Sequence, residues 1–434
     1  MGWSGPPKSA RLRRIAIEVD ANRVHLPLAP ADPVRETSPF DFGGRSMGRK
    51  YTVISADGHV ETPPESWIRH LDEQFHPHAP QLVKLRTGGE AWLIEGQPLV
   101  PNGQNITGRG PVKVKGGSYF NAEGAPAEGA GDGLQRLREQ DLDGIDAEVL
   151  FPPVFASRLI ETISDKDAYR ALIRAYNTFL ADDYCSVAPD RLIGNAVMPV
   201  TSVDDAVAEL EFIASRGLIS ASFHKFPNGS GYAAPEDDLF WKRSIELGIK
   251  LSPHFGFGAW APEVNFVGVG ISADPFAGTL VQRINGIPPT YCLAQLVMSG
   301  VFDRFPDIEF YFAETNASWL PWALFVLDDN YQIFRGVFER TLDRLPSEYI
   351  LDHCYFGIIR DPKAIAMHQH LPFDRLMFGS DFPHSVGSYP NTTRFLDEAF
   401  AGVDESFRRM MLLETPAKFY GLDLDADITA TPPA

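Results

Sequence analysis

A short motif, Asp57-Gly58-His59, places a carboxylate and an imidazole two residues apart at the end of an apolar run, residues 51–57. If that run is a strand, alternate residues share a face, so both side chains point to the same side. Glu61 continues the same alternation. A converging carboxylate and imidazole suit a divalent cation. An isolated pair of this kind is more often a turn cap beside a buried histidine, so the rest of the chain must decide.

Four further apolar runs carry ionisable residues at their carboxyl ends: His224 and Lys225 in 219–225, His254 in 250–255, Glu314 in 308–314 and Asp381 in 375–381. Barrel enzymes gather their catalytic groups at the carboxyl ends of the strands. Ionisable side chains are rare inside a barrel unless they are paired or bind a metal. The repeated pattern therefore predicts a metal site.

His384 follows Asp381 by three residues, in the segment GSDFPHS. This position lies just beyond a predicted strand, on the side of the barrel mouth. We expect His384 to contact the substrate or to orient a metal ligand.

Eight apolar runs rich in β-branched or aromatic residues can form the strands that position these groups: 51–57, 147–153, 192–200, 219–225, 250–255, 308–314, 354–359 and 375–381. Helical patterns lie between them, including residues 204–217, which end in a glycine, and the amphipathic stretch 317–334. Alternating strands and helices indicate a parallel sheet, and eight strands favour a closed (β/α)₈ barrel.

Three parts of the chain are predicted from this pattern. Residues 1–50 read as an N-terminal arm, residues 51–421 as the barrel, and residues 422–434 as a tail. An insertion at about 60–133 follows the first strand. It contains a predicted β-hairpin at 81–96 and a glycine-rich loop. Since it follows a strand end, we expect it to lie over the mouth and cover the substrate.

The composition excludes several classes of partner. A net charge of −18 disfavours binding to nucleic acid or to an anionic membrane, both of which need a basic surface. Cys185, Cys292 and Cys354 are far apart and odd in number, so they predict neither a disulfide framework nor a zinc cluster. No apolar run approaches the roughly 20 residues of a membrane span. A cytoplasmic protein with a small-molecule substrate is expected, and a homodimer or higher homo-oligomer is the expected assembly.

The chain resembles the amidohydrolase-related family, which includes aromatic-acid decarboxylases and hydrolases of the amidohydrolase superfamily. The resemblance covers roughly residues 51–421 and rests on an ordered set of motifs: VISADGHVETPPESW, LREQDLDGIDAEVLFPP, SPHFG, FAETNASWLP, LPSEYI and FGSDFPHS. It implies a distorted (β/α)₈ barrel with a divalent metal, commonly zinc or manganese. Carried over residue by residue, it implies that Asp57, His59, His254 and Asp381 are the metal ligands.

Two departures from the family pattern enrich the site. Decarboxylases of this type often have a histidine after the sixth strand, where this chain has Glu314 and Asn316, and many relatives lack a histidine at the position of His224. With the four implied ligands, His224 and Glu314 make three carboxylates and three imidazoles, enough for two metals. A single metal, which we favour, leaves His224 and Glu314 as acid, base or supporting groups.

The resemblance implies a metal-dependent hydrolase or carboxy-lyase. Asp381 then serves as ligand and proton shuttle, Glu314 or His384 as general acid, and Lys225 as the partner of an anionic substrate group. The alternative is a diiron monooxygenase that activates O₂ in a natural-product pathway, as some amidohydrolase-like proteins do. Aromatic residues near the predicted mouth, among them Phe255 and Trp319, suit an aromatic or apolar ligand, and Asn316 is a further predicted substrate contact.

Overall fold

The computed structural model describes residues 48–84, 90–95, 97–99, 118–153, 160–258, 287–338 and 340–432. Residues 1–47 of the predicted arm lie outside this range, as does part of the predicted insertion.

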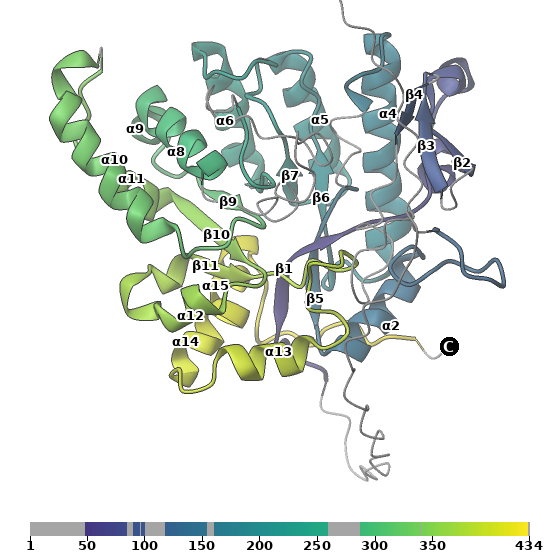
Figure 1. Cartoon of the computed structure of the whole chain (residues 1–434). Helices are drawn as coiled ribbons and strands as arrows, with labels where there is room; N and C mark the ends of the chain where they lie inside the picture. The colour runs from purple at the N-terminus through teal and green to yellow at the C-terminus, as the bar shows by residue number, and fades with distance from the viewer. Residues whose placement is uncertain are drawn as a thin grey trace, which may run out of the picture. The chain divides into compact units, whose positions relative to one another are not determined.

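Eight parallel strands form one sheet whose neighbours follow the order of the chain (Figure 1). They are β1 (Ile54–His59), β5 (Ala147–Phe151), β6 (Leu192–Val197), β7 (Ser220–Ser222), β8 (Lys250–Leu251), β9 (Phe310–Phe312), β10 (Cys354–Ile358) and β11 (Leu376–Phe378). The circle closes where Gly58 forms a parallel bridge with Phe382. There the Asp381 N–H donates to the Asp57 carbonyl over 2.8 Å, and the His59 N–H donates to the Phe382 carbonyl over 2.7 Å. The predicted (β/α)₈ barrel is confirmed.

Helices follow most strands and pack on the outside of the barrel. They are α2 (Gly133–Asp143), α4 (Lys166–Phe179), α5 (Val203–Ser215), α6 (Asp238–Leu247), α8 (Ile287–Ser299), α9 (Val301–Arg304), α10 (Leu320–Phe334), α11 (Pro346–His353), α12 (Pro362–Ala366), α13 (Thr392–Ala399), α14 (Glu405–Arg409) and α15 (Thr415–Tyr420). The helix predicted at 204–217 corresponds to α5, where Ser202 accepts a hydrogen bond from the Asp205 N–H and caps the helix. No described helix is long and apolar enough to cross a membrane.

Side chains inside the barrel alternate with those that face the helices. On β5, Ala147, Val149 and Phe151 belong to the interior cluster, whereas Leu150 packs with the outer core. Tyr420 of α15 belongs to the same interior cluster, and its hydroxyl lies 3.0 Å from the Ser252 hydroxyl.

The insertion after β1 carries a three-stranded antiparallel sheet of β2 (Gln81–Lys84), β3 (Glu90–Ile94) and β4 (Gln97–Leu99), seen at the right of Figure 1. The predicted pairing of β2 with β3 is present, and its Gly-Gly turn lies outside the described residues. Trp67 of α1 (Glu65–Ile68) fixes the insertion to the barrel, because its ring contacts both Trp92 of β3 and Tyr176 of α4.

The end of the insertion reaches the barrel mouth. A side chain at Gly129 would lie 2.2 Å from the Pro383 ring, so only glycine allows this approach. The Tyr389 hydroxyl donates to Glu128 over 3.0 Å. Both contacts lie beyond the carboxyl end of β11, as predicted for a segment that covers the mouth. That the insertion covers the substrate stays a prediction.

Candidate metal centre

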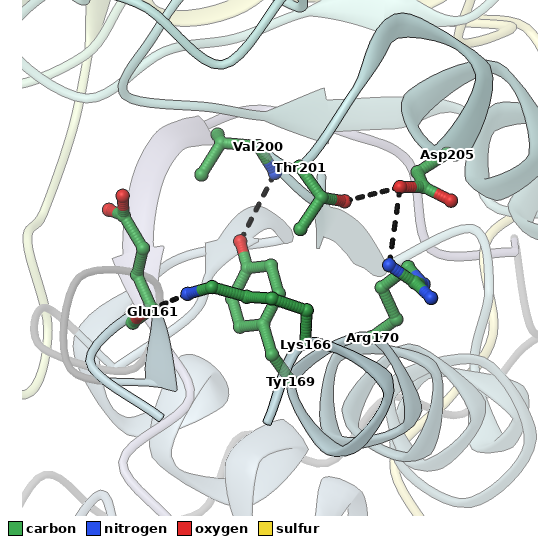
Figure 2. A pocket seen from close by; sticks show the side chains of 7 residues that line it. All are labelled: Glu161, Lys166, Tyr169, Arg170, Val200, Thr201 and Asp205. Carbon is green, nitrogen blue, oxygen red and sulfur yellow. Dashed lines mark hydrogen bonds and ion pairs between the residues drawn. The ribbon is translucent and has the colours of Figure 1, made fainter. Parts of the chain in front are cut away.

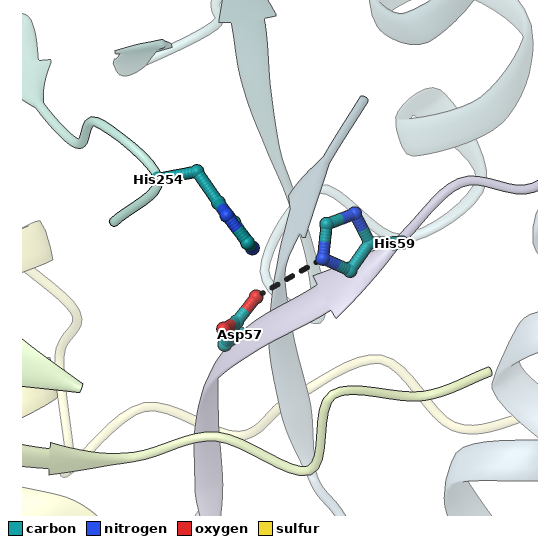
Figure 3. Close-up of side chains that lie close together, drawn as sticks. All are labelled: Asp57, His59 and His254. Atoms are coloured by element: carbon teal, nitrogen blue, oxygen red, sulfur yellow. Dashed lines mark ion pairs between the residues drawn. The ribbon is translucent and has the colours of Figure 1, made fainter. Parts of the chain in front are cut away.

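Two groups of candidate ligands meet at the carboxyl ends of the strands and share His59. In the first, ligand atoms of Asp57, His59 and His254 lie within 4.8 Å of one another, and in the second, those of His59, Asp381 and His384 do. Figure 3 shows Asp57 and His59 at the end of β1, with the His254 ring turned toward them from the end of β8. The structure thus brings the four ligands implied by the resemblance to one place. Their role as ligands stays a prediction.

A β-bulge aims the two ligands of β1. Ile54 and Ala56 pack in the barrel interior, so strict alternation would turn Asp57 outward. The pairing of β1 with β5 shifts between Ser55 and Gly58, however, and this irregularity brings Asp57 and His59 to the inner side. The sequence analysis predicted that Asp57 and His59 point inward, which is correct. It assumed a regular strand, however, and β1 is irregular.

The loops that leave the strands have unusual backbone. Apart from Glu95, the described non-glycine residues with positive φ all follow strand ends at the mouth: Phe255 (61°), Glu314 (53°), Asn316 (53°) and Asp381 (55°). This left-handed conformation is unfavourable for residues with a Cβ. Such strain persists where the surroundings impose it and is concentrated at functional sites.

Hydrogen bonds fix the rings of the two histidines on either side of Asp381. His59 Nδ1 lies 2.9 Å from the Pro152 carbonyl, which can only accept, so Nδ1 carries the proton and Nε2 presents its lone pair to the site. His384 Nδ1 lies 3.0 Å from Asp381 Oδ1, and its Nε2 lies 3.3 Å from Glu61 Oε1. A buried Asp381–His384–Glu61 chain therefore supports one side of the centre.

Several buried atoms of this centre have no hydrogen-bond partner among the described residues. They are both carboxylate oxygens of Asp57, Nε2 of His59 and Oδ2 of Asp381. Buried polar atoms are almost always hydrogen-bonded, and an unpaired buried carboxylate is costly. These oxygen and nitrogen donors are the ligands that zinc and manganese accept, so the residues fit a divalent cation.

The charge states of the metal-free centre follow from burial and proximity. Burial raises the pKa of Asp57 well above its ordinary value, and the Asp381 carboxylate raises it further. Burial also acts to raise the pKa of Asp381, but His384 and His59 outweigh it and hold that pKa below the ordinary value. Burial lowers the pKa of His59, which favours the neutral ring that binds metals. For His384 burial opposes protonation, yet Asp381 and Glu61 raise its pKa well above the usual range.

The residues predicted after β9 line the same end of the barrel. Glu314 Oε2 lies 3.4 Å from His254 Nε2. Asn316 Oδ1 accepts a hydrogen bond from the Ile359 N–H, and Trp319 Nε1 donates to the Asn316 carbonyl. The first bond ties the β9 loop to the end of β10, and the second lies within the loop. Contact of Asn316 and Trp319 with a substrate stays a prediction.

His224 and Lys225 share one acidic partner, Glu161, that the sequence expectation missed. His224 Nε2 lies 2.7 Å from Glu161 Oε2, and the Lys225 ammonium pairs with Oε1 of the same carboxylate. The hydrogen bond from His224 is the main cause that lowers the Glu161 pKa to about 2. Within the described residues, neither group of converging ligands includes His224 or Glu314.

A cavity of about 390 Å³ opens beside this ion pair, between the start of α4 and the loop after β6 (Figure 2). Its lining combines two cations, two carboxylates and less polar groups: Glu161, Lys166, Tyr169, Arg170, Val200, Thr201 and Asp205. Figure 2 shows the Arg170 side chain pointing toward Asp205, with which it forms an ion pair of 3.5 Å. Asp57, His59 and His254 do not line this cavity, so the converging ligands, and not the cavity, mark the candidate centre.

Comparison with known families gives a match over most of the chain. A family described as Amidohydrolase matches residues 126–422, a range that includes His254 and Asp381 and begins after β1.

Solved structures with the same fold include an amidohydrolase and two decarboxylases. An amidohydrolase from Mycobacterium avium subsp. paratuberculosis K-10 has a TM-score of 0.64 and 19% identity, over 86% of this chain and 99% of that one. A variant of 5-carboxyvanillate decarboxylase from Novosphingobium aromaticivorans DSM 12444, with bound manganese and 3-methoxy-4-hydroxy-5-nitrobenzoic acid, has a TM-score of 0.54 and 20% identity, over 66% and 80%. A 2,6-dihydroxybenzoate decarboxylase from Rhizobium has a TM-score of 0.53 and 18% identity, over 68% and 90%.

Proposed function

The chain belongs to the amidohydrolase family, and from this premise we propose that it is a metal-dependent hydrolase or carboxy-lyase. Its proposed substrate is a small aromatic or apolar molecule with a carboxylate or carbonyl group. The observation that carries the proposal is a set of buried ligand atoms on Asp57, His59 and Asp381 that have no hydrogen-bond partner among the described residues. His59 Nε2 lies 3.6 Å from Asp57 Oδ1 and 3.4 Å from Asp381 Oδ1, so these atoms face one another. Burying such atoms reduces stability, which is accounted for if they bind a cation.

Asp57, His59, His254 and Asp381 are the residues that would hold the cation. Manganese or zinc suits this mixture of carboxylates and imidazoles, and one structural neighbour, the 5-carboxyvanillate decarboxylase variant, has bound manganese. When bound, a divalent cation supplies Lewis-acid polarisation of a carbonyl or carboxylate oxygen.

The chain's own residues provide a proton and an apolar wall. His384 is held between Asp381 and Glu61, which raise its pKa, so its Nε2 is placed to donate a proton to a leaving group or to a ring carbon. The ring of His254 contacts both Phe151 and Phe255, with ring centroids 5.4 and 4.6 Å away. Phe151 is buried and Phe255 is partly exposed, so an aromatic substrate can pack against the Phe255 ring.

We propose one metal rather than two. A pair of irons, as the monooxygenase alternative requires, needs His224 and Glu314 as further ligands. In the part of the chain that the structure describes, the Nε2 atom of His224 pairs with Glu161 instead. This arrangement supports the mononuclear choice.

The test combines metal counting with a substrate panel. Protein stripped with a chelator is reloaded separately with Mn²⁺, Zn²⁺ and Fe²⁺, and metal per chain is measured. Each form is then assayed with hydroxybenzoates and aryl esters for CO₂ release and hydrolysis, and for O₂ consumption. We expect about one metal per chain and turnover without O₂. No bound metal, or two irons with O₂ consumption, would contradict the proposal.

A further inference from the structure

The feature that carries a further inference is Arg136 of α2, whose side chain is almost completely buried at 1% exposure. Its Nη1 donates to the His59 carbonyl over 3.1 Å, and its Nη2 donates to the Phe382 carbonyl over 3.0 Å. One guanidinium group therefore joins the last residue of β1 to the residue that follows Asp381. Both chain segments carry predicted metal ligands.

A second buried network anchors the guanidinium itself. Arg136 Nε donates to Glu148 Oε2 over 2.6 Å. The same oxygen accepts from Gln140, and Glu148 Oε1 accepts from the Ser380 hydroxyl over 2.9 Å. Because Ser380 precedes Asp381, the carboxylate of Glu148 also holds the end of β11. The guanidinium and its counter-ion thus act on the same strand end.

The Arg136–Glu148 ion pair lies so close to Gly58 that the central residue of the DGH motif must be glycine. A Cβ on Gly58 would lie 2.6 Å from Arg136 Nη2 and 2.8 Å from Glu148 Oε1. The ion pair therefore packs directly against the backbone that separates Asp57 from His59. A planar fork with several donors fits this role, whereas a lysine ammonium cannot reach both carbonyls and the carboxylate in the same geometry.

Several hydrogen bonds join the two strand ends. β1 pairs with β5 through four residue pairs, and it meets the residues after β11 at the isolated Gly58–Phe382 bridge, which hydrogen bonds from the Asp381 N–H and the His59 N–H close. The Ser55 hydroxyl also accepts from the Ser380 N–H over 2.9 Å and donates to the Ser380 hydroxyl over 3.1 Å. Arg136 adds a connection from α2 through the His59 and Phe382 carbonyls, and the Phe382 carbonyl accepts from both His59 and Arg136.

We propose that Arg136 is a positioning residue for the metal centre, which sets the separation of the β1 and β11 ligands through the His59 and Phe382 carbonyls. This inference rests on the proposed function, because it concerns the same centre. Loss of an outer partner of a metal ligand typically lowers metal affinity by about 10- to 100-fold. Arg136→Lys should do the same while the barrel stays folded.

The chain offers a matched control in Arg191, which is also fully buried at 0% exposure. Arg191 donates to the Asp146 carbonyl over 2.7 Å and pairs with Asp141 over 2.7 Å, at the amino end of β6. Arg191→Lys makes the same chemical change at the other end of the barrel. We expect it to change metal affinity by less than about twofold, although it lowers stability.

The experiment titrates Mn²⁺ into metal-free wild type, Arg136→Lys and Arg191→Lys, with free Mn²⁺ read by electron paramagnetic resonance and folding checked by circular dichroism. A 10- to 100-fold weaker affinity in Arg136→Lys alone supports the inference. Equal affinity in wild type and Arg136→Lys, or an equal loss in Arg191→Lys, overturns it while the proposed function stands. A wild type that binds neither Mn²⁺ nor Zn²⁺ overturns both proposals.

Glu148→Gln provides a second variant in case Arg136→Lys does not fold. It keeps the guanidinium and its bonds to the two carbonyls but weakens its anchor. We expect a loss of roughly threefold to tenfold in Mn²⁺ affinity, below the range of about 10- to 100-fold for a lost outer partner, because the guanidinium and its two carbonyl bonds remain. Wild-type affinity in a folded Glu148→Gln protein contradicts the inference.

Discussion

Two buried aspartates at opposite ends of the barrel have opposite surroundings. At the amino end, Asp146 accepts hydrogen bonds from the Thr52 N–H, the Thr52 hydroxyl and the Val53 N–H, and it pairs with Arg49. At the carboxyl end, Asp57 has no hydrogen-bond partner for either oxygen among the described residues, and its Oδ1 lies 3.6 Å from His59 Nε2. The hydrogen bonds of Asp146 stabilise the closed circle of strands, whereas the unsatisfied oxygens of Asp57 reduce stability in favour of ligand binding.

The strongest test of this contrast is Asp57→Asn. It removes a proposed ligand, so we expect metal affinity to fall by more than the roughly 100-fold that an outer partner costs. It also removes one of two buried carboxylates that repel each other, so the metal-free variant should melt at a higher temperature than metal-free wild type. Metal analysis and calorimetry of the stripped proteins measure both effects. A lower melting temperature would show that Asp57 is stabilised in a way the structure does not reveal.

The matched change at the amino end is Asp146→Asn. It weakens a buried acceptor of several hydrogen bonds and its pair with Arg49, so we expect a loss of about 3 kcal/mol in the free energy of unfolding. Metal content should stay at that of wild type. Urea denaturation with metal counting checks both. If the loss stays under about 1 kcal/mol, or metal is lost as well, the two ends do not have separate roles.

A smaller effect is expected at the rim, where Glu161 pairs with His224 and Lys225. The pKa of Glu161 is about 2 in the folded protein and 4.5 ordinarily, so its ionised form favours folding above about pH 4.5. That contribution is lost as the pH falls from 4.5 toward 2. Glu161→Gln should therefore show a shallower drop in melting temperature than wild type over this range. Parallel curves for the two proteins would mean that the ion pairs do not persist in solution.

The smallest expected effect is that of His224→Ala on metal content. Because Nε2 of His224 pairs with Glu161, we expect one metal per chain in both variant and wild type. Binding of an anionic substrate analogue should weaken, since Glu161 is then freer to compete for Lys225. Loss of one of two metal equivalents would instead favour the diiron alternative.

The sequence was sufficient to predict the barrel and the end at which ionisable groups gather. Strand periodicity depends on local residues, and the carboxyl ends of parallel strands necessarily meet. These two facts placed Asp57, His254 and Asp381 at one end of the barrel without knowledge of any contact. The irregular strand β1 was not predictable, because a bulge depends on how a strand pairs with its neighbour.

Contacts between residues far apart in the chain could not be predicted from the sequence either. Glu161 and His224 are 63 positions apart, and Arg136 reaches a carbonyl 246 positions away. Arg136 and Glu148 both occur in the motif LREQDLDGIDAEVLFPP, yet nothing in their spacing of 12 residues shows that they form a buried pair. Only the packing of α2 beneath the β1 and β11 ends reveals it.

The seam between β1 and β11 joins the start of the barrel to its end, as the hydrogen bond from Ser55 to Ser380 across 325 positions illustrates. A ribosome must therefore synthesise nearly the whole chain before the two halves of the ligand set can meet. Helices and early strand pairs can form long before that point, but none of them creates the cation site. Since a ligand that binds only the native state stabilises it, the proposed cation stabilises only a chain whose barrel is closed. On this proposal, the cation binds only after β11 has been synthesised.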